Sequence, residues 1–287
     1  MIYILLSVFC SVTVAVFLKL GKRYNISIIQ AVTINYLTAL GLCLVFFKPS
    51  ISSEISSSPW HIYIGLAILL PSIFLVLAAS VKHIGIVKTD IAQRLSLFIP
   101  ILAAYFIFGE SFNIYKIIGL LVGFTAIILT LARKSKKEDN QRSWLLPIVV
   151  FLGFGIIDIL FKQIALYKAI PYTTSLFVVF CLSFLVALII TIYMLVSGMA
   201  KLQLVNIACG FLLGIFNFGN ILFYLKAHQA LPKNPSTVFA AMNLGVIMVG
   251  SLVGILVFKE RVNKLNYVGI ALALVAIVLI KISQDAF

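Results

Sequence analysis

Charged side chains stand inside long apolar segments of the chain, where an ionisable group is costly and usually serves binding or ion coupling. Asp158 and Lys162 are four residues apart in one such segment, and Asp90 and Arg94 repeat this spacing in another. Residues four apart lie on one face of a helix, so each acid can meet its base. The pairs predict groups that bind a charged substrate or couple its movement to an ion. The alternative is that these charges form structural pairs or anchor helices at the membrane interface.

Uncharged polar side chains interrupt other apolar segments. Asn217, Asn220 and Tyr224 follow one face of a helix at steps of three and four. An amide in hydrocarbon needs a partner, so such a face should point at protein or water. We expect these side chains to line a substrate cavity, and hydrogen bonding between helices is the alternative. The full group is Asn35, Gln93, Asn217, Asn220, Tyr224 and Asn243.

The sequence lacks the motifs of several membrane enzymes and pumps. It has no Walker loop, no DDxxD-like carboxylate cluster, no HExxH and no GxSxG. These absences argue against an ATP-driven pump, a prenyltransferase, a metalloprotease and a serine hydrolase. We therefore predict no catalytic residue, no cofactor and no metal. The cysteines lie in apolar runs without CxxC spacing, so no disulfide framework is expected either; they are Cys10, Cys43, Cys181 and Cys209.

The composition identifies the environment of these segments. Apolar residues make up 63% of the 287 residues and charged residues only 10%, whereas a soluble domain has about 45–50% and about 25%. This excess excludes a soluble enzyme and predicts a multi-pass protein of the cell membrane, which is the plasma or inner membrane in a bacterium. The 22 Lys and Arg against 8 Asp and Glu are spread over the ends of the apolar segments. That distribution is typical of topology signals and contacts with membrane lipids, and it argues against nucleic acid as a partner.

Ten apolar runs are each long enough to cross the ~30 Å hydrocarbon core as a helix. They show no period-two alternation, so we predict an all-α integral membrane protein with ten transmembrane helices. We expect His83 and His228, near the ends of two runs, to lie at the membrane interface. The runs are Ile2–Leu20, Ile26–Phe47, Trp60–Val81, Thr89–Phe108, Phe112–Leu131, Trp144–Ala165, Thr173–Val196, Val205–Leu225, Pro235–Phe258 and Val262–Ile282.

The two halves of the chain repeat each other. Phe108–Gly119 and Phe258–Gly269 share Phe, Glu, Asn and Gly at matching positions, 150 residues apart. We therefore divide the chain into a first five-helix repeat over 1–132, a basic linker over 133–143 and a second five-helix repeat over 144–287. Because five is odd, the second repeat starts on the opposite side of the membrane. Inverted repeats of this kind are typical of alternating-access transporters, and gene duplication without transport is the alternative.

A carboxylate opens the last predicted span of each half. We expect Glu110 and Glu260 to cap the helix that follows them, because a helix N-terminus has free N–H groups and a positive dipole end. Asn113 and Asn263, three residues later, could bond back to the same turn. A gate or a proton site is the alternative role of the two carboxylates.

The layout and these turns resemble the EamA-type branch of the drug/metabolite transporter superfamily. In the first half the resemblance rests on Ile99-Pro100 and on Phe108-Gly109-Glu110 with Gly119. In the second half it rests on Phe258-Lys259-Glu260 and Gly269; Lys259 departs from the pattern because Gly109 stands in the first half. The resemblance implies ten helices around a central cavity between the halves. It also implies secondary transport of a small metabolite, often export.

The predicted function is therefore secondary transport by alternating access. Lys162 and Arg94 as cations, with Asp158 as the acid, would suit a zwitterion or a small anion, and an amino acid or a related metabolite is the first expectation. A proton on Asp90 or Asp158 could drive transport, and passive exchange is the alternative. The alternative function is a membrane-embedded enzyme, or a handler of a lipid-linked intermediate, that uses Asp90, Asp158 and Arg94.

Two properties stay open at the level of sequence. Close helix packing at GxxxG stretches fits a monomer as well as a homodimer. Lysine and arginine are more numerous in the connections on the side of the 133–143 linker, which favours both termini outside the cell. The family resemblance implies termini in the cytoplasm instead.

Overall fold

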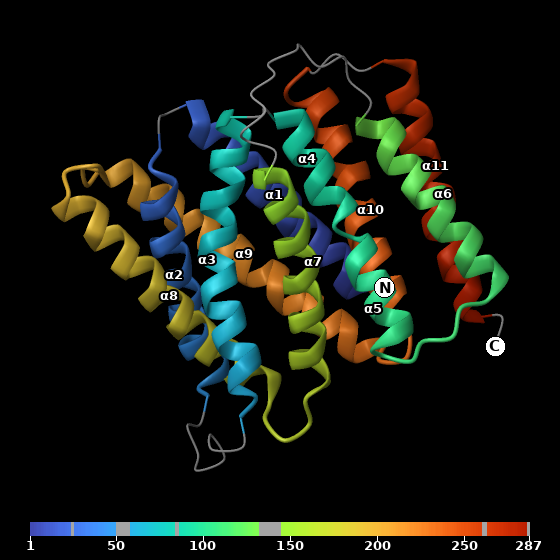
Figure 1. Ribbon diagram of the computed structural model, residues 1–287, viewed down its shortest axis with the longest axis horizontal. Coiled ribbons are helices and arrows are strands. Elements are labelled where there is room, and N and C mark those ends of the chain that lie inside the picture. The colour runs from blue at the N-terminus through green and yellow to red at the C-terminus, as the bar shows by residue number, and fades with distance from the viewer. Residues whose placement is uncertain (24–25, 50–57, 84–85, 132–144, 260–262, 286–287) are drawn as a thin grey trace.

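A computed structural model describes residues 1–23, 26–49, 58–83, 86–131, 145–259 and 263–285. Helices make up the ordered elements of these ranges, and none of the ranges contains a strand, as the sequence predicts for an all-α protein. The predicted linker 133–143 and Glu260 lie outside the described residues. The helices (Figure 1) are α1 (Ile2–Arg23), α2 (Ile28–Phe47), α3 (Trp60–His83), α4 (Ile86–Leu95), α5 (Phe98–Phe106), α6 (Ile114–Leu131), α7 (Leu145–Leu166), α8 (Tyr172–Val196), α9 (Leu204–Ala230), α10 (Pro235–Leu256) and α11 (Lys264–Asp285).

Most of these helices have the length and composition of membrane spans. Seven helices in the described part of the chain are long and apolar enough to cross a bilayer. Two further apolar stretches are shorter, Ile2–Phe17 in α1 and Ile114–Thr130 in α6. Large apolar side chains are exposed on the outside of the bundle, which suits lipid as solvent and would be unfavourable in water. Examples are Val45, Phe46, Ile189, Val196, Leu204 and Leu256.

The predicted span Thr89–Phe108 is wrong as a single helix, because the structure divides it into α4 and α5. Pro100 has no N–H to donate to Ser96, and the Ser96 carbonyl instead accepts from the N–H of Ile99 at 3.0 Å. The Ser96 hydroxyl also donates to the Gln93 carbonyl at 2.6 Å. The helix therefore breaks at Ser96 and Leu97. Ten membrane crossings remain a prediction, since one of them would consist of two short helices.

The last helices of the two halves pack against each other in opposite directions (Figure 1). Near the start of α6, the Asn113 amide donates to the Ser283 carbonyl of α11 at 2.8 Å. Near the start of α11, the Asn266 amide donates to the Thr130 carbonyl of α6 at 2.7 Å. Each helix thus satisfies free carbonyls at the end of the other. A helix pair related in this way is the arrangement that inverted repeats would produce.

Gly109 and Lys259, which correspond at the 150-residue offset, precede these two helices and share a backbone feature. Gly109 has φ 64° and Lys259 has φ 51°, both in the left-handed region. Glycine adopts this region without steric cost, whereas the Cβ of a lysine comes too close to the backbone there. The lysine that departs from the family pattern therefore occupies a backbone conformation that suits glycine.

The start of α1 and the end of α11 lie at one end of the bundle. The Lys226 ammonium of α9 lies 5.8 Å from the ring centroid of Tyr3, near the start of α1. The Asn113 contact places the end of α11 beside the start of α6, and Lys116 of α6 reaches Asn234 between α9 and α10 at 3.1 Å. We call this the terminal end. The opposite end, where α6 ends and α7 begins, is the linker end.

Candidate functional site

A cavity of about 350 Å³ lies among helices of both halves. Seven helices contribute to its wall: α1, α2, α3 and α4 from the first half, and α7, α9 and α10 from the second. Aromatic and aliphatic side chains, among them Phe74, Phe154 and Met242, form much of the wall. The polar residues of the wall are Ser11, Tyr36, Asp90, Gln93, Arg94, Ser96, Asp158, Asn217, Asn220, Tyr224 and Asn243.

Most of the predicted site residues meet on this cavity. Of the ten candidates, all line it except Lys162 and Asn35. Neighbouring residues of a helix point about 100° apart, and on α2 it is Tyr36 rather than Asn35 that reaches the cavity. Asn35 is buried where α2 packs on α9, and its amide has no hydrogen-bond partner among the described residues. The residues that share the wall are Asp90, Gln93, Arg94, Asp158, Asn217, Asn220, Tyr224 and Asn243.

Asp90 and Arg94 form the salt bridge that their spacing suggests. Arg94 Nε lies 3.5 Å from Asp90 Oδ1, with side chains 17% and 37% exposed respectively. The bridge uses Nε, and in the described part of the chain the terminal nitrogens of Arg94 make no other hydrogen bond. A guanidinium can bind a carboxylate with two parallel hydrogen bonds. The pair can therefore hold a ligand carboxylate while Asp90 keeps Arg94 in place.

Asp158 and Lys162 do not pair, which corrects the expectation from their spacing. Asp158 Oδ1 accepts a hydrogen bond from the Tyr224 hydroxyl at 2.9 Å. Lys162 is fully buried; its ammonium donates to the Pro232 carbonyl at 3.1 Å and lies 5.9 Å from the centroid of the Phe108 ring. Lys162 lies one turn nearer to the terminal end than Asp158, and its long side chain finds a carbonyl acceptor there. The cavity therefore holds the acid without the lysine.

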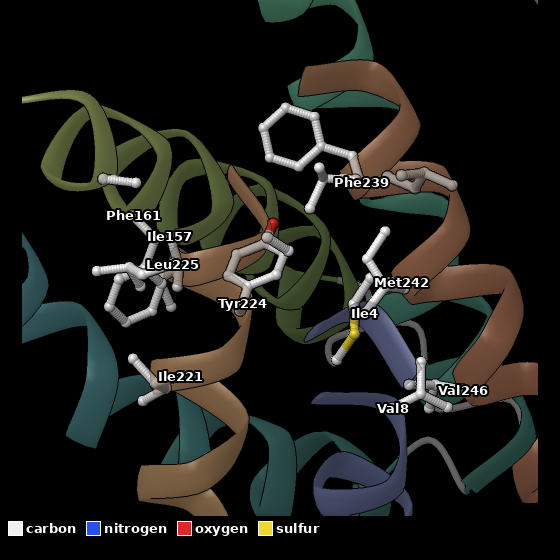
Figure 2. Close-up of a cluster of buried hydrophobic side chains, with 14 of the residues drawn as sticks. Ile4, Val8, Ile157, Phe161, Ile221, Tyr224, Leu225, Phe239, Met242 and Val246 are labelled. Carbon is white, nitrogen blue, oxygen red and sulfur yellow. The ribbon is translucent and has the colours of Figure 1, made fainter. Parts of the chain in front are cut away.

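Below Asp158, toward the terminal end, the interior is filled. Phe161, Tyr224 and Met242 are the last wall residues of their helices on this side. Figure 2 shows Tyr224 at the centre of this layer, between side chains of α1, α7 and α10. Beyond it, Lys162, His228 and Phe239 are fully buried. The cavity thus lies on the linker side of a closed floor.

His228 is part of this layer: it is fully buried two residues before the end of α9, and its expected depth at the membrane interface stays a prediction. Its ring centroid lies 4.7 Å from that of Tyr224 and 4.8 Å from that of Phe239, in edge-to-face contacts. Neither ring nitrogen has a hydrogen-bond partner among the described residues. The sequence contains an indication that His228 faces the interior, because the polar face that includes Asn220 and Tyr224 continues in a step of four to His228.

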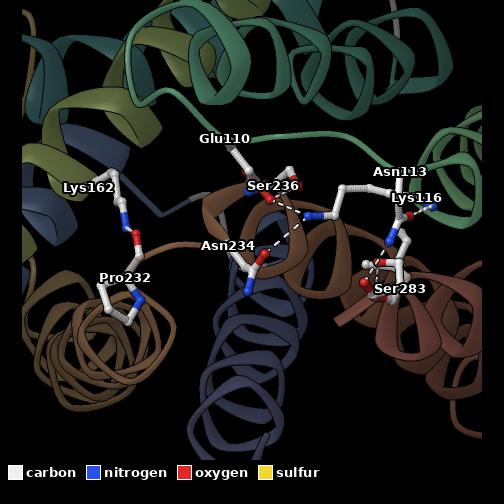
Figure 3. A network of polar contacts seen from close by, with 9 residues as sticks. Glu110, Asn113, Lys116, Lys162, Pro232, Asn234, Ser236 and Ser283 are labelled. Atoms are coloured by element: carbon white, nitrogen blue, oxygen red, sulfur yellow. Dashed lines mark hydrogen bonds and ion pairs between the residues drawn. The ribbon is translucent and has the colours of Figure 1, made fainter. Parts of the chain in front are cut away.

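A buried polar network joins the two halves at the terminal end (Figure 3). Glu110, which follows α5, accepts hydrogen bonds from the Ser236 N–H at 2.8 Å and the Ser236 hydroxyl at 2.7 Å. The Lys116 ammonium donates to Glu110 Oε1 at 2.5 Å and to Asn234 Oδ1 at 3.1 Å. The side chains of the ion pair are only 3% and 1% exposed. Glu110 therefore caps α10 of the other half, and the expectation that it caps its own span is corrected.

The cap of α6 comes from Asn113 instead. Its side-chain oxygen accepts from the Lys116 N–H at 2.8 Å, the geometry of an N-terminal cap. Asn263 and Asn266 form a reciprocal pair at the start of α11, since each side-chain oxygen accepts from the backbone N–H of the other, at 2.9 and 2.8 Å. The asparagine side chains thus cap the starts of α6 and α11. Glu110 instead binds Ser236 of the other half.

The chemistry of the cavity suits recognition of a small polar molecule. Two carboxylates, one guanidinium and several amides surround an interior that is otherwise apolar. Among the described residues, no group of three His, Cys, Asp or Glu side chains is placed to hold a metal ion.

Comparison with known proteins adds the following. A model of the EamA-like transporter family matches residues 1–132 and 133–282. A protein of Haemophilus influenzae, described as an uncharacterized protein, is 40% identical over 284 residues, which is 96% of this chain and 95% of that protein. A protein of known crystal structure superposes with a TM-score of 0.69 over 97% of this chain and 96% of its own, at 13% identity. That likeness shows a shared fold.

Proposed function

Because the chain belongs to the EamA-like transporter family, we propose that it is a secondary transporter that moves a small metabolite by alternating access. The chain is an integral membrane protein of a transporter family. The observation that carries the proposal is the cavity between the halves, lined by polar side chains from six helices. Polar groups inside a membrane bundle usually mark the path of a substrate.

The arrangement of the halves supports alternating access. In an inverted repeat, each half can adopt the conformation of the other, so one end of the cavity opens as the other closes. The antiparallel pairing of α6 and α11 agrees with such a repeat. The filled floor beneath Tyr224 supports the assignment of this arrangement to the state closed at the terminal end. Ten crossings, with α4 and α5 together forming one of them, complete this scheme.

For the substrate we propose a small zwitterion, an amino acid or a relative of one. Asp158 would take the ammonium and Arg94 the carboxylate. The small anion that the sequence also suggested loses support, because Lys162 points away from the cavity. With two carboxylates and one guanidinium, the wall favours a ligand that brings a positive group.

Direction, driving force and membrane are part of the same proposal. We propose export across the plasma membrane, or across the inner membrane in a bacterium. Asp158 is the carboxylate most suited to carry a proton, because the group that binds it in the described part of the chain is the neutral Tyr224 hydroxyl. Asp90, by contrast, is held by Arg94. Passive exchange would need no such group.

The alternative is a membrane-embedded enzyme or a handler of a lipid-linked intermediate. Such a site needs its reactive groups near one interface, where lipid headgroups lie. Asp158, Arg94 and the amides of the cavity instead come from the interior portions of several helices. That distribution favours passage of a substrate over reaction at a headgroup.

Ligand-dependent melting of the purified protein tests the proposed binding. A ligand that binds the folded state raises the melting temperature in a concentration-dependent manner. We expect zwitterionic amino acids, rather than small carboxylates without an amine, to raise it. Asp158→Asn should need about tenfold or more ligand for the same shift. A panel in which the carboxylates alone stabilise the protein would contradict the proposed substrate class.

A further inference from the structure

The network at the terminal end connects segments that must separate if that end opens. Glu110 lies in the turn between α5 and α6 and Lys116 lies in the first turn of α6, both in the first half of the chain. Ser236 and Asn234 belong to the start of α10 and the turn before it, in the second half. Three hydrogen bonds join the halves: Lys116 to Asn234, and the Ser236 N–H and hydroxyl to Glu110. A fourth joins Lys116 to Glu110 within the first half. Within the described residues, no other ion pair or hydrogen bond of a charged side chain joins the halves; the contacts of Lys162 with Phe108 and of Lys226 with Tyr3 are made to aromatic rings.

These contacts are of a strong type. Hydrogen bonds between charged groups are roughly twice as strong as neutral ones, and here both charges are almost completely buried. Separation of one partner would leave a buried charge without compensation. Glu110 also lies at the positive end of α10, where a carboxylate is favoured. The closed arrangement therefore satisfies the Glu110 carboxylate and the Lys116 ammonium, which opening would leave buried without a partner.

The same position in the second half has a different residue. Lys116 corresponds to Asn266 at the 150-residue offset of the repeat. The Asn266 amide binds carbonyl groups at the end of α6, at 2.7 Å for Thr130 and 3.2 Å for Leu129. It therefore holds the antiparallel helix pair together and supplies no ammonium. An exchange of roles between the halves would consequently not recreate the lysine contact at the linker end.

We infer that Glu110 and Lys116 form a latch that holds the terminal end closed, and that Lys116 makes closure at the two ends unequal. The inference rests on the proposed function, since it assigns the residues that set the resting state of the transporter. It predicts that the protein without substrate rests with its cavity accessible from the linker end. Opening of the terminal end requires the Lys116 and Ser236 contacts to break.

The latch also has a physical route to the cavity. Ser236 lies three residues before Phe239, on the first turns of α10. Phe239 packs on His228, and His228 packs on Tyr224, whose hydroxyl binds Asp158. A ligand that takes the place of the hydroxyl on Asp158 would move the ring on which this layer packs. Binding in the cavity could thereby weaken the seating of α10 against Glu110.

Distance measurements between spin labels test the latch. One pair of labels replaces Ser111 and Lys233, which are exposed on either side of the latch. A second pair replaces His83 and Lys259, which are exposed at the linker end. Both pairs are placed in a background in which the four native cysteines are alanine. The wild-type protein without substrate should show a single short distance between positions 111 and 233.

Lys116→Asn, which introduces the residue of the second half, should raise the ratio of long to short distances at the terminal end by about fivefold or more. Lys116→Arg should keep the short distance because it retains the charge. Lys168→Asn removes a lysine from the exposed turn between α7 and α8 and is the matched control. It should leave the distances unchanged. Should Lys116→Asn misfold, the double variant Glu110→Gln with Lys116→Met removes both charges and carries the same expectation.

The two label pairs separate failure of the latch from failure of the proposed function. A wild-type distance between 111 and 233 in the folded Lys116→Asn or double variant would overturn the latch. A longer terminal distance with a shorter linker-end distance supports the latch and alternating access together. A longer terminal distance with no change at the linker end supports the latch and contradicts alternating access.

Discussion

Tyr224 donates its hydroxyl hydrogen to Asp158 at 2.9 Å, from α9 to α7, on the floor of the cavity. The same ring packs on His228 and, with a centroid separation of 6.5 Å, on Phe161. In the ligand-free protein the Tyr224 hydroxyl is therefore bound to the carboxylate that we propose for the substrate ammonium. A substrate must compete with this hydrogen bond or use the second carboxylate oxygen.

Tyr224→Phe tests that relationship. The variant removes the donor and leaves an aromatic ring of nearly the same shape, so the packing on His228 persists. Loss of a hydrogen bond to a shielded carboxylate should destabilise the ligand-free protein by about 1–3 kcal/mol. We expect a lower melting temperature without ligand and a larger rise with an amine ligand, both measured by thermal unfolding in detergent. An unchanged melting temperature would show that the bond contributes nothing.

Asp158 and Lys162 should act independently, because the structure separates them. Lys162→Met should leave ligand affinity within about twofold of wild type, as expected for sites that share no partner. Asp158→Asn should reduce affinity for an amine by about tenfold or more, because it removes a charged acceptor. Isothermal titration of both single variants and the double variant measures the coupling. Strong coupling between the two substitutions would contradict this separation and would indicate that Asp158 and Lys162 form the ion pair that their spacing suggested.

Two glycines, Gly210 of the GxxxG stretch 210–214 and Gly250 of the GxxxG stretch 250–254, should respond in opposite ways to alanine. A Cβ at Gly210 would lie 2.6 Å from the Ala31 carbonyl oxygen of α2, whereas one at Gly250 meets nothing within 4 Å. Gly210→Ala should therefore destabilise the protein by about 1–3 kcal/mol through overpacking. Gly250→Ala should be neutral or stabilise by about 0.4–1 kcal/mol. Melting temperatures that fall equally would argue against the close packing of α2 and α9.

The repeated turn offers a second matched pair. Lys259→Gly should stabilise the protein, because the left-handed conformation costs a lysine about 1–2 kcal/mol and the flexibility of glycine returns only part of that. Gly109→Ala should destabilise by a similar amount, and its Cβ would meet nothing within 4 Å. In both variants the expected change in stability comes from the free energy of the left-handed backbone conformation. Thermal unfolding of the two variants should move in opposite directions, and movement in the same direction would contradict the shared turn.

Much of the fold followed from patterns within the sequence. Apolar length placed Trp60 and Phe47 at helix ends, and the 150-residue offset related Asn113 to Asn263. The break near Pro100 was harder, because Pro71 lies inside α3 without ending it. Whether a proline divides a helix depends on neighbouring helices that satisfy the released groups, and a local pattern does not contain them.

The site was predictable where helical faces decide it. Asn217, Asn220 and Tyr224 share a face, and all three line the cavity. The direction of Lys162 was not predictable, because its acceptor is a carbonyl seventy residues away. Glu110 likewise reaches Ser236 across 126 residues. Contacts of this kind depend on how the halves dock, which no spacing within one helix can reveal.

Transport in proteoliposomes tests the central claim most directly. Liposomes loaded with an unlabelled zwitterionic amino acid receive the labelled compound outside, and exchange is followed in wild type, Asp158→Asn and Lys168→Asn. We predict saturable exchange for wild type and Lys168→Asn, and exchange at the level of empty liposomes for folded Asp158→Asn. An imposed pH gradient should drive accumulation if Asp158 carries a proton. Exchange by Asp158→Asn at the wild-type rate would contradict the account of the cavity as the transport site.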